Sequence, residues 1–361
     1  MTTQTDCFRQ VLVLYLGRPL ASFKSTSEDV PGYHRQVRQT RKRWRRMHSL
    51  SLGAVFFFLA PTLPGQSPNS SDAAMAKRIE ASPALPFVEQ RLVLHASTSG
   101  WEIGAVSGVA ADKNGNLVVM QRGTKADPIL VFDRRGNLLR SWGKGDFTLP
   151  HSLRIDPSGN IWAVDAGASR IIKYSQMGKK LLVISVAPVP NTGSPFRGIT
   201  DIAFAPGGNL YITDGYGNAR VVEYTAEGSQ VHEWGHAGIA SGEFHLPHAI
   251  QIGPDGTIYV ADRENGRIQK FDRSGHFLGA IDHLGRCYAL VLDQGALWAS
   301  VSPMAEDPGS PGWILKLDPV SGTILGHMDV PDQRSGHALD LLPSGEPVVT
   351  AGNDLLLFQR P

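Results

Sequence analysis

The sequence has 361 residues, of which 42% are hydrophobic, so it is long and apolar enough to fill a large core. This composition excludes disorder as the general state of the chain. Charged residues make up 19%, and 39 Gly and 24 Pro favour an all-β chain with many tight turns. With only Cys7 and Cys287, the chain can build neither a disulfide framework nor a cysteine-rich zinc module. A metal here must therefore use His or carboxylate ligands.

The N-terminal 46 residues are strongly basic: they hold ten Lys or Arg and three Asp or Glu, whereas residues 47–361 hold 25 and 30. The basic cluster 41–46 is typical of a nucleic-acid patch, but an apolar run, 50–63, follows it directly. This run of about 14 residues is too short to span a membrane and suits a signal peptide. We therefore expect export to the periplasm or the cell exterior, with a membrane anchor or a buried strand as the alternatives. Nothing outside the basic leader predicts nucleic-acid binding.

The expected organisation has four parts: a basic leader at 1–46, a signal peptide at 47–76, a linker at 77–85, and a repeat domain at 86–361. Met47 is a second candidate start, in which case the leader is not translated. Cleavage is expected near Gly65 or after Ala76, and no stable membrane span is expected to remain after it.

A glycine turn between two short strand-like runs recurs through the rest of the chain. The turn glycines are Gly115, Gly159, Gly208, Gly256, Gly295 and Gly345. A third apolar run follows in each unit, so each stretch of roughly 46 residues has the size of a propeller blade. Six units predict an all-β, six-bladed β-propeller. The last unit ends before a fourth strand, and the segment 87–95 is the expected strand that closes the ring.

Counting eight residues back from each glycine reaches the expected start of the innermost strand of that blade. Alternate blades present a histidine there, at His151, His248 and His337, and the other blades present Ser107, Thr200 and Cys287. Alternate blades of a six-bladed ring are related by a pseudo-threefold axis, so the three imidazoles are expected to converge. This is a catalytic zinc arrangement, although iron, cobalt or copper accept the same ligands. The alternative is three ordinary core or surface histidines.

A competing zinc pattern occurs at 232–236, where His-Glu-Trp-Gly-His matches H-E-x-x-H. That chemistry needs both histidines on one face of a helix, and the flanking sequence predicts strands instead. We therefore do not expect a metalloprotease.

Two further candidates follow glycine turns, at the other end of the hairpin. Arg122 comes seven residues after Gly115, and Tyr216 comes eight after Gly208. Antiparallel pairing brings the end of a second strand beside the start of the first, so both side chains are placed to approach the metal. The alternative is a buried cation stacked between blades and an aromatic cap.

These motifs resemble the peptidyl-α-hydroxyglycine α-amidating lyase family, which consists of zinc-containing six-bladed propellers of NHL type. The resemblance covers about residues 104–345. It lies in the motifs 106–109, 121–123, 149–151, 214–220, 246–248 and 261–269.

The resemblance implies that His151, His248 and His337 bind zinc, that Tyr216 is the base near the metal, and that Arg122 orients the substrate. It implies cleavage of a peptidyl-α-hydroxyglycine or a similar carbinolamide to an amide and glyoxylate. The partner is then a small-molecule or peptide substrate. A separate hydroxylating enzyme is expected to supply it, because no copper monooxygenase domain precedes the propeller.

The resemblance also implies a structural calcium, held by an Asp after the third histidine and by the backbone carbonyls of Val109 and Leu153. Ala338 stands at the Asp position, so this calcium site is incomplete. Asp340, on the same strand face, is a candidate substitute. Gly217 stands where the animal enzymes have a cysteine after the tyrosine.

Three classes of function remain open. A zinc-dependent carbon-nitrogen lyase is the first. A non-catalytic NHL-type binding module, in which the histidines are incidental, is the second. A metal-dependent propeller hydrolase that activates water is the third, and its calcium version would need a carboxylate-rich site that this register lacks.

Overall fold

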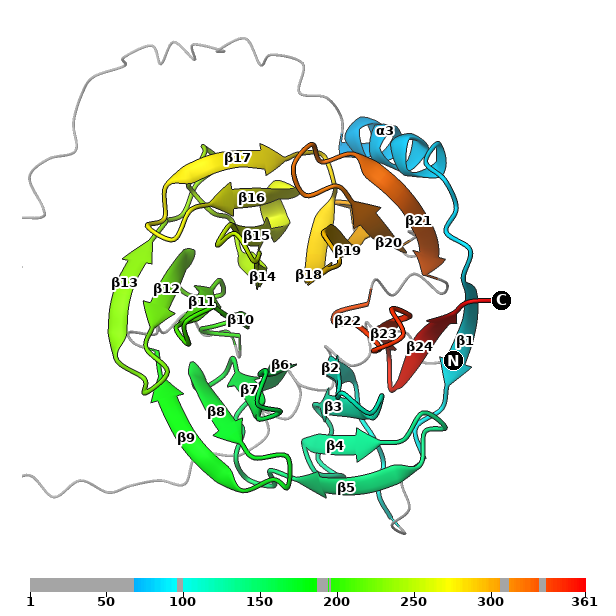
Figure 1. Cartoon of the computed structure of the whole chain (residues 1–361), viewed down its shortest axis with the longest axis vertical. Helices are drawn as coiled ribbons and strands as arrows, with labels where there is room; N and C mark the ends of the chain where they lie inside the picture. Colours follow the sequence, from blue (N-terminus) through cyan, green and yellow to red (C-terminus); the bar gives the residue numbers. More distant parts are fainter. Residues whose placement is uncertain (1–67, 96–99, 187–193, 195, 306–311, 331–335) are drawn as a thin grey trace, which may run out of the picture. The chain divides into compact units, whose positions relative to one another are not determined.

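The computed structural model describes residues 68–95, 100–186, 194, 196–305, 312–330 and 336–361. All of them belong to one compact unit, Pro64–Pro361. Six four-stranded antiparallel sheets stand around a central axis, as Figure 1 shows. The expected six-bladed β-propeller is confirmed. The leader and most of the expected signal peptide lie outside the described residues.

Each blade runs from an innermost strand to an outermost one. The innermost strands are β2 (Val106–Ala111), β6 (Pro150–Ile155), β10 (Asp201–Phe204), β14 (Pro247–Ile252), β18 (Arg286–Asp293) and β22 (Leu339–Leu341). The second strands are β3 (Leu117–Gln121), β7 (Ile161–Asp165), β11 (Leu210–Asp214), β15 (Ile258–Asp262), β19 (Ala296–Ser302) and β23 (Pro347–Ala351). The third strands are β4 (Ile129–Phe132), β8 (Arg170–Tyr174), β12 (Arg220–Tyr224), β16 (Arg267–Phe271), β20 (Gly312–Leu317) and β24 (Asp354–Gln359). The outermost strands are β5 (Leu138–Trp142), β9 (Lys180–Ser185), β13 (Gln230–Trp234), β17 (Phe277–Ile281), β21 (Ile324–Val330) and β1 (Val88–Leu92).

The ring closes through β1, which comes from the start of the domain. It pairs antiparallel with β24 at the C-terminus, from Val88 opposite Gln359 to Leu92 opposite Leu355. This pairing covers the edge that β24 would otherwise expose, as expected from the early end of the last repeat. The two ends of the domain are thereby held in one sheet (Figure 1).

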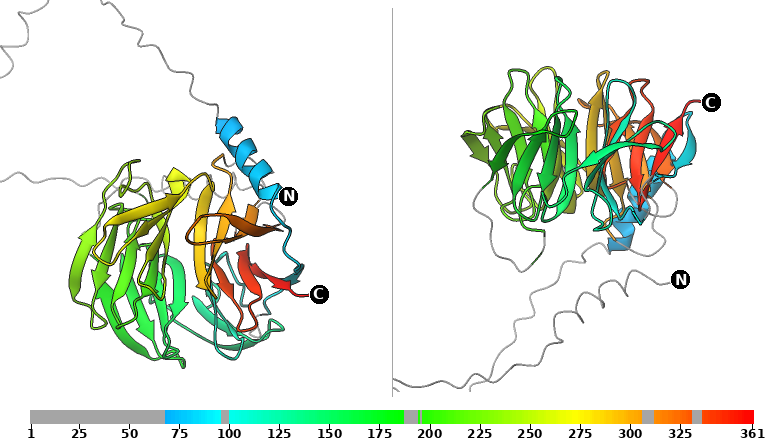
Figure 2. Two further views of the ribbon diagram at one scale, coloured as in Figure 1. Left: turned by 45° about the horizontal axis from the view of Figure 1, so that its top comes forward. Right: turned by 90° about the horizontal axis from the view of Figure 1, so that it is seen from below.

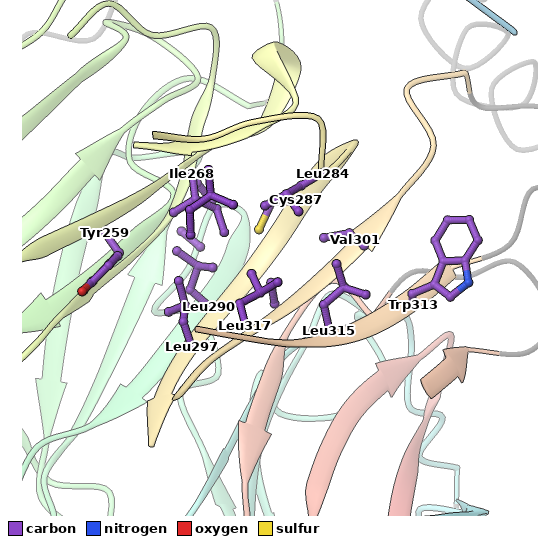
Figure 3. Close-up of a cluster of buried hydrophobic side chains, with 14 of the residues drawn as sticks. Tyr259, Ile268, Leu284, Cys287, Leu290, Leu297, Val301, Trp313, Leu315 and Leu317 are labelled. Carbon is purple, nitrogen blue, oxygen red and sulfur yellow. The ribbon is translucent and has the colours of Figure 1, made fainter. Parts of the chain in front are cut away.

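The core lies between neighbouring blades. Second strands such as β3, β7 and β11 are buried along their whole length, because one face of each blade packs on the preceding blade and the other face on the following blade. This explains their continuous apolar runs, which lack the alternation of a half-exposed strand. Figure 3 shows one such cluster between the fourth and fifth blades, where Ile268 packs near Leu290 and Leu317.

A helix, α3 (Pro68–Glu80), packs on the propeller beside β21 (Figure 2). Its Arg78 donates to the carbonyl oxygens of Asp282 and His283, just before β18. Its Met75 and Ile79, one turn apart, are buried in the same hydrophobic cluster as Ile268 and Leu290. Asp72 accepts hydrogen bonds from the backbone N–H groups of Met304 and Ala305. The helix therefore crosses the expected boundary between signal peptide and linker at residue 76. No helix in the described part of the chain is long and apolar enough to cross a membrane.

A 3-10 helix, η1 (Arg263–Asn265), follows β15 and completes the described helical elements. It lies at the end of the second strand of the fourth blade, which is the end that faces the start of β14. Its position matters for the site, because Arg263 lies over the Tyr288 ring and Glu264 accepts a hydrogen bond from Arg286.

Candidate metal centre

The three predicted histidines meet on the channel axis. His151 lies in β6, His248 in β14, and His337 two residues before β22. One ring nitrogen from each lies within 4.8 Å of the other two, and all three side chains are largely buried. Their ring centroids are 4.7 to 5.1 Å apart. The convergence expected from alternate blades is therefore present.

Local backbone irregularities aim two of these rings at the axis. The β6–β7 register shifts between Pro150 and Ser152, and the β14–β15 register shifts between Pro247 and Ala249. His151 and His248 are thus the extra residues of two β-bulges. A bulge turns a side chain out of the regular alternation of the strand, and here it turns each imidazole into the channel.

Backbone carbonyls of the neighbouring blades fix the tautomer of all three rings. The Nδ1–H groups donate to the carbonyl oxygens of Thr200, Tyr288 and Ser107 at distances of 2.7, 2.8 and 2.8 Å. A carbonyl oxygen can only accept, so Nδ1 must carry the proton and Nε2 keeps its lone pair. This outer set of hydrogen bonds is typical of metal-binding imidazoles, because it orients the ring and leaves the other nitrogen as the ligand.

Burial also keeps the rings neutral. It lowers the pKa of all three histidines, and lowers the pKa of His337 to about 3. The positive charges of Arg122 and Arg263 act in the same direction on His248. Metal binding requires neutral imidazole, so this environment suits a cation that accepts three nitrogen ligands.

Tyr216 lies directly beside this group. Its hydroxyl oxygen is 3.0 Å from Nε2 of His151 and 3.4 Å from Nε2 of His248. Burial raises the pKa of the phenol, whereas the charges of Arg263 and Arg122 lower it. The structure thus places Tyr216 where the sequence predicted it, two residues after β11.

Arg122, directly after β3, reaches the same point from the first blade. Its Nε donates to the carbonyl oxygen of Pro150 at 3.0 Å, and its Cζ lies 5.4 Å from the ring centroid of Phe196. Its Nη2 is 3.5 Å from Nε2 of His337. The guanidinium therefore stands at the rim of the histidine group with its orientation held by the Pro150 carbonyl.

Two residues at the site were not singled out from the sequence. Arg263 in η1 places its Cζ 5.2 Å from the ring centroid of Tyr288, and its Nε donates to Glu264 at 2.9 Å. Glu264 also accepts from Nε of Arg286 at 3.0 Å. Arg263 lies within the motif 261–269, but that motif was interpreted as part of the NHL-type repeat and not as part of the site. Its approach to Tyr216 depends on the fold of η1.

The fifth blade departs from the expected register by one residue. Its hairpin is a two-residue turn, in which Gln294 and Gly295 have φ of 47° and 77°. Counting eight back from Gly295 therefore reaches Cys287, which is buried in the blade core, and the bulged residue is Tyr288. Tyr288 lines the channel and its carbonyl holds His248, so the expected channel position of Cys287 is corrected to Tyr288.

The residues expected around calcium line the same cavity as the three histidines. Val109, Leu153 and Ala338 line a cavity of about 20 Å³, which holds about one water molecule. Asp340 accepts hydrogen bonds from the backbone N–H groups of Ala111 and Leu341 at 2.8 and 2.9 Å. The carboxylate is therefore already bound to protein donors.

Comparisons with known proteins show which proteins this chain resembles. A family model described as NHL repeat matches residues 244–271. The chain is 31% identical over 295 residues to peptidyl-alpha-hydroxyglycine alpha-amidating lyase 1 of Drosophila melanogaster, covering 72% of this chain and 52% of that protein. It is 35% identical over 232 residues to the peptidyl-glycine alpha-amidating monooxygenase of Mus musculus, covering 54% of this chain and 24% of that protein.

A solved structure of streptogramin B lyase superposes with a TM-score of 0.55 at 16% identity, covering 76% of this chain and 98% of that one. At this identity the likeness shows the propeller fold alone. The matches to the named relatives span a quarter to half of the length of those proteins. The resemblance seen in the motifs is confirmed: this chain is a homologue of the peptidyl-α-hydroxyglycine α-amidating lyases and carries an NHL-type six-bladed propeller.

Proposed function

We propose that the chain is a zinc-dependent lyase, of the peptidylamidoglycolate lyase type, that cleaves a peptidyl-α-hydroxyglycine or a similar carbinolamide to an amide and glyoxylate. One observation carries the proposal. Three imidazoles with protonated Nδ1 and unprotonated Nε2 converge within 4.8 Å, and the Tyr216 hydroxyl lies beside them. The hydrogen bonds from Nδ1 to neighbouring blades need only one nitrogen of each ring, and they do not account for the convergence of the three Nε2 atoms.

The donor set fits zinc. His151, His248 and His337 would hold the ion, and three nitrogen ligands leave one coordination position for substrate. When bound, zinc supplies a Lewis acid that lowers the pKa of a hydroxyl group next to it. The remaining chemistry falls to side chains of the chain itself.

Tyr216 is the proposed base. Its ionised oxygen takes the proton of the α-hydroxyl, and the O–H electron pair becomes the second bond of a carbonyl. The carbon-nitrogen bond breaks, its electron pair stays on nitrogen, and Tyr216 returns the proton to that nitrogen to complete the amide. Burial raises the pKa of Tyr216 above its ordinary value, and the positive charges of Arg263 and Arg122 offset part of this rise, which favours the phenolate.

Arg122 is the proposed anchor for the substrate carboxylate. Its Nε is bound to the Pro150 carbonyl, which leaves the guanidinium oriented at the rim of the site. A guanidinium can hold a carboxylate through two parallel N–H bonds, and an ammonium group cannot. The carboxylate that becomes glyoxylate is the group that this arrangement suits.

The alternative of a non-catalytic NHL-type binding module rests on the NHL repeat match at 244–271. A metal-dependent hydrolase is the third class, and it would use the same histidines to activate water. A binding module needs no metal, so metal analysis of the purified chain separates it from the two enzymes.

The test of the proposed reaction is glyoxylate release from a synthetic peptidyl-α-hydroxyglycine by the zinc-loaded chain. The matched control is His248→Ala, compared at equal folded content by circular dichroism. Release by the parent and not by the variant supports the lyase. A folded, zinc-loaded parent that releases no glyoxylate contradicts the proposed substrate.

We also propose that the chain is exported and that the mature protein keeps α3. Cleavage after Ala76 would remove Asp72 and Met75, which bind the β19–β20 connection and the core. Cleavage near Gly65 leaves the helix whole, so it is the site we favour. N-terminal sequencing of the protein recovered from the periplasm or medium tests this, and a first residue at 77 would contradict it.

A further inference from the structure

A buried ion pair joins the second and third blades in the wall of the cavity that the three histidines also line. Arg154 of β6 binds Asp201 of β10 through two bonds, Nε to Oδ1 at 3.1 Å and Nη2 to Oδ2 at 2.5 Å. The two side chains are only 14% and 4% exposed. This geometry is the bidentate arrangement that makes arginine-carboxylate pairs strong and directional.

The pair connects strands from four blades. Nη2 of Arg154 also donates to the carbonyl oxygen of Leu290 in β18, at 3.2 Å. Oδ2 of Asp201 accepts from the backbone N–H of Ile250 in β14, at 3.2 Å. A single guanidinium thus links the second, third and fifth blades directly and the fourth through its carboxylate partner.

The other two blades meet at a second carboxylate. Asp340 of β22 accepts from the Ala111 N–H of β2, which joins the sixth blade to the first. The Arg154 charge lowers the pKa of Asp340 against burial, which raises it. Arg154 therefore binds Asp201 directly, and its charge also acts on Asp340, which joins the two remaining blades.

The calcium that the family resemblance implies does not fit these residues. Calcium takes six to eight oxygen ligands, including carboxylates. Ala338 supplies no side-chain oxygen and packs against an apolar cluster, while Asp201 is bound to Arg154 and Asp340 to two backbone N–H groups. The Arg154 guanidinium also neutralises the Asp201 carboxylate, which removes a negative charge that would attract calcium.

We propose that the Arg154 guanidinium takes the place of the divalent cation on the propeller axis, so that an internal charge joins the blades and the fold needs no calcium. The proposal concerns the Arg154–Asp201 pair and does not depend on the proposed lyase reaction. Its readouts are calcium content and thermal stability, which are independent of catalysis.

The first experiment uses the purified chain, dialysed free of calcium and then measured with and without about 1 mM calcium chloride. We expect no bound calcium by elemental analysis and a melting temperature that changes by less than about 1 °C, because a ligand that binds the folded state must raise it. One calcium per chain, or a rise of several degrees, would overturn the proposal.

The second experiment removes the internal charge. Arg154→Gln leaves Asp201 buried without its partner, so we expect the melting temperature to fall by about 5–15 °C. The matched control is Arg134→Gln, which removes a half-exposed arginine that pairs with Glu346 at 2.9 Å. It is expected to shift the melting temperature by less than about 2 °C. Equal shifts for the two variants would contradict a special role for Arg154.

The third experiment restores a calcium site. Ala338→Asp returns the missing carboxylate, and we expect calcium to stabilise it only when combined with Arg154→Ser. Calcium binding by Ala338→Asp alone would show that the guanidinium does not occupy the cation position. Failure of the folded double variant to bind calcium would also contradict a shared position. If Arg154→Gln does not fold, the measurement on the unaltered chain still decides the proposal.

Discussion

Two groups of histidines in this chain carry a zinc-type signature, and the structure brings the ring nitrogens of only one of these two groups together. His232 and His236 match a known motif within five consecutive residues. His151, His248 and His337 are separated by 97 and 89 residues and match no local motif. The distant three have nitrogens within 4.8 Å of one another, and the contiguous two contact different partners. Closeness in sequence is thus a poor guide to convergence when the element is a strand.

The difference follows from the secondary structure. The H-E-x-x-H motif works when a helix turn places residues i and i+4 on one face. Here residues 230–234 form β13, an exposed outermost strand. His232 bonds the Ser274 carbonyl at 3.0 Å, whereas His236 lies beyond the strand and contacts Glu243 at 3.2 Å. The prediction that the H-E-x-x-H motif at 232–236 does not lie on a helix is confirmed.

The largest effect is expected from removing one histidine of the converging group. His248→Ala removes one of three ligands and one of the neutral nitrogens on the axis. We expect zinc affinity to fall by more than about 100-fold and glyoxylate release to drop to background, because losing even an outer-shell partner costs 10- to 100-fold. Zinc content after gel filtration, by elemental analysis, measures the first effect. Full zinc retention in the variant would show that the three rings do not form one site.

A smaller effect is expected when the three histidines are kept and only the neighbouring hydroxyl group is removed. Tyr216→Phe keeps the ring that packs beside Phe196 and His151 and removes only the oxygen. We expect zinc to be retained and kcat to fall by about 10²–10⁴-fold, the usual contribution of a general base. Steady-state kinetics with a fixed zinc content tests it. Unchanged kcat would exclude Tyr216 as the base.

A still smaller effect on activity is expected from a change of Arg122, at the rim of the site. Arg122→Lys keeps the charge and loses the paired N–H geometry, so kcat/KM should fall by about 10- to 100-fold, mostly through KM. A substrate analogue with an amide in place of the carboxylate sharpens the test. The parent and the variant should use that analogue equally poorly. If the variant is still worse on the analogue, Arg122 acts through something other than the carboxylate.

The repeat spacing predicted the fold because each blade is a local unit. The glycine turns, the three runs per unit and the early end of the last repeat were sufficient to predict six blades closed by β1. The histidine register followed from the same local count, since the three blades that carry the histidines share one hairpin length. Where a hairpin differs, the count fails: the two-residue turn at Gln294 and Gly295 moves the channel position to Tyr288.

Other features depend on contacts that no local pattern records. Arg154 meets Asp201 after 47 residues and Leu290 after 136, so only the closed ring shows that they share the axis. Helix α3 is stabilised by burying Met75 and Ile79 against the fifth blade, and its sequence reads equally well as the end of a signal peptide. Arg263 reaches Tyr288 because η1 turns it inward.

The smallest effect is expected at the contiguous motif, and it completes the comparison. His236→Ala removes a ring that is 75% exposed and pairs with Glu243 at the surface, where an ion pair contributes little. We expect the free energy of unfolding to change by less than about 0.5 kcal/mol, with zinc content and glyoxylate release unchanged. Urea titration and elemental analysis measure both. A loss of zinc in this variant would mean that a strand-borne H-E-x-x-H can hold metal. The spacing of the motif would then matter more than the helix that normally carries it.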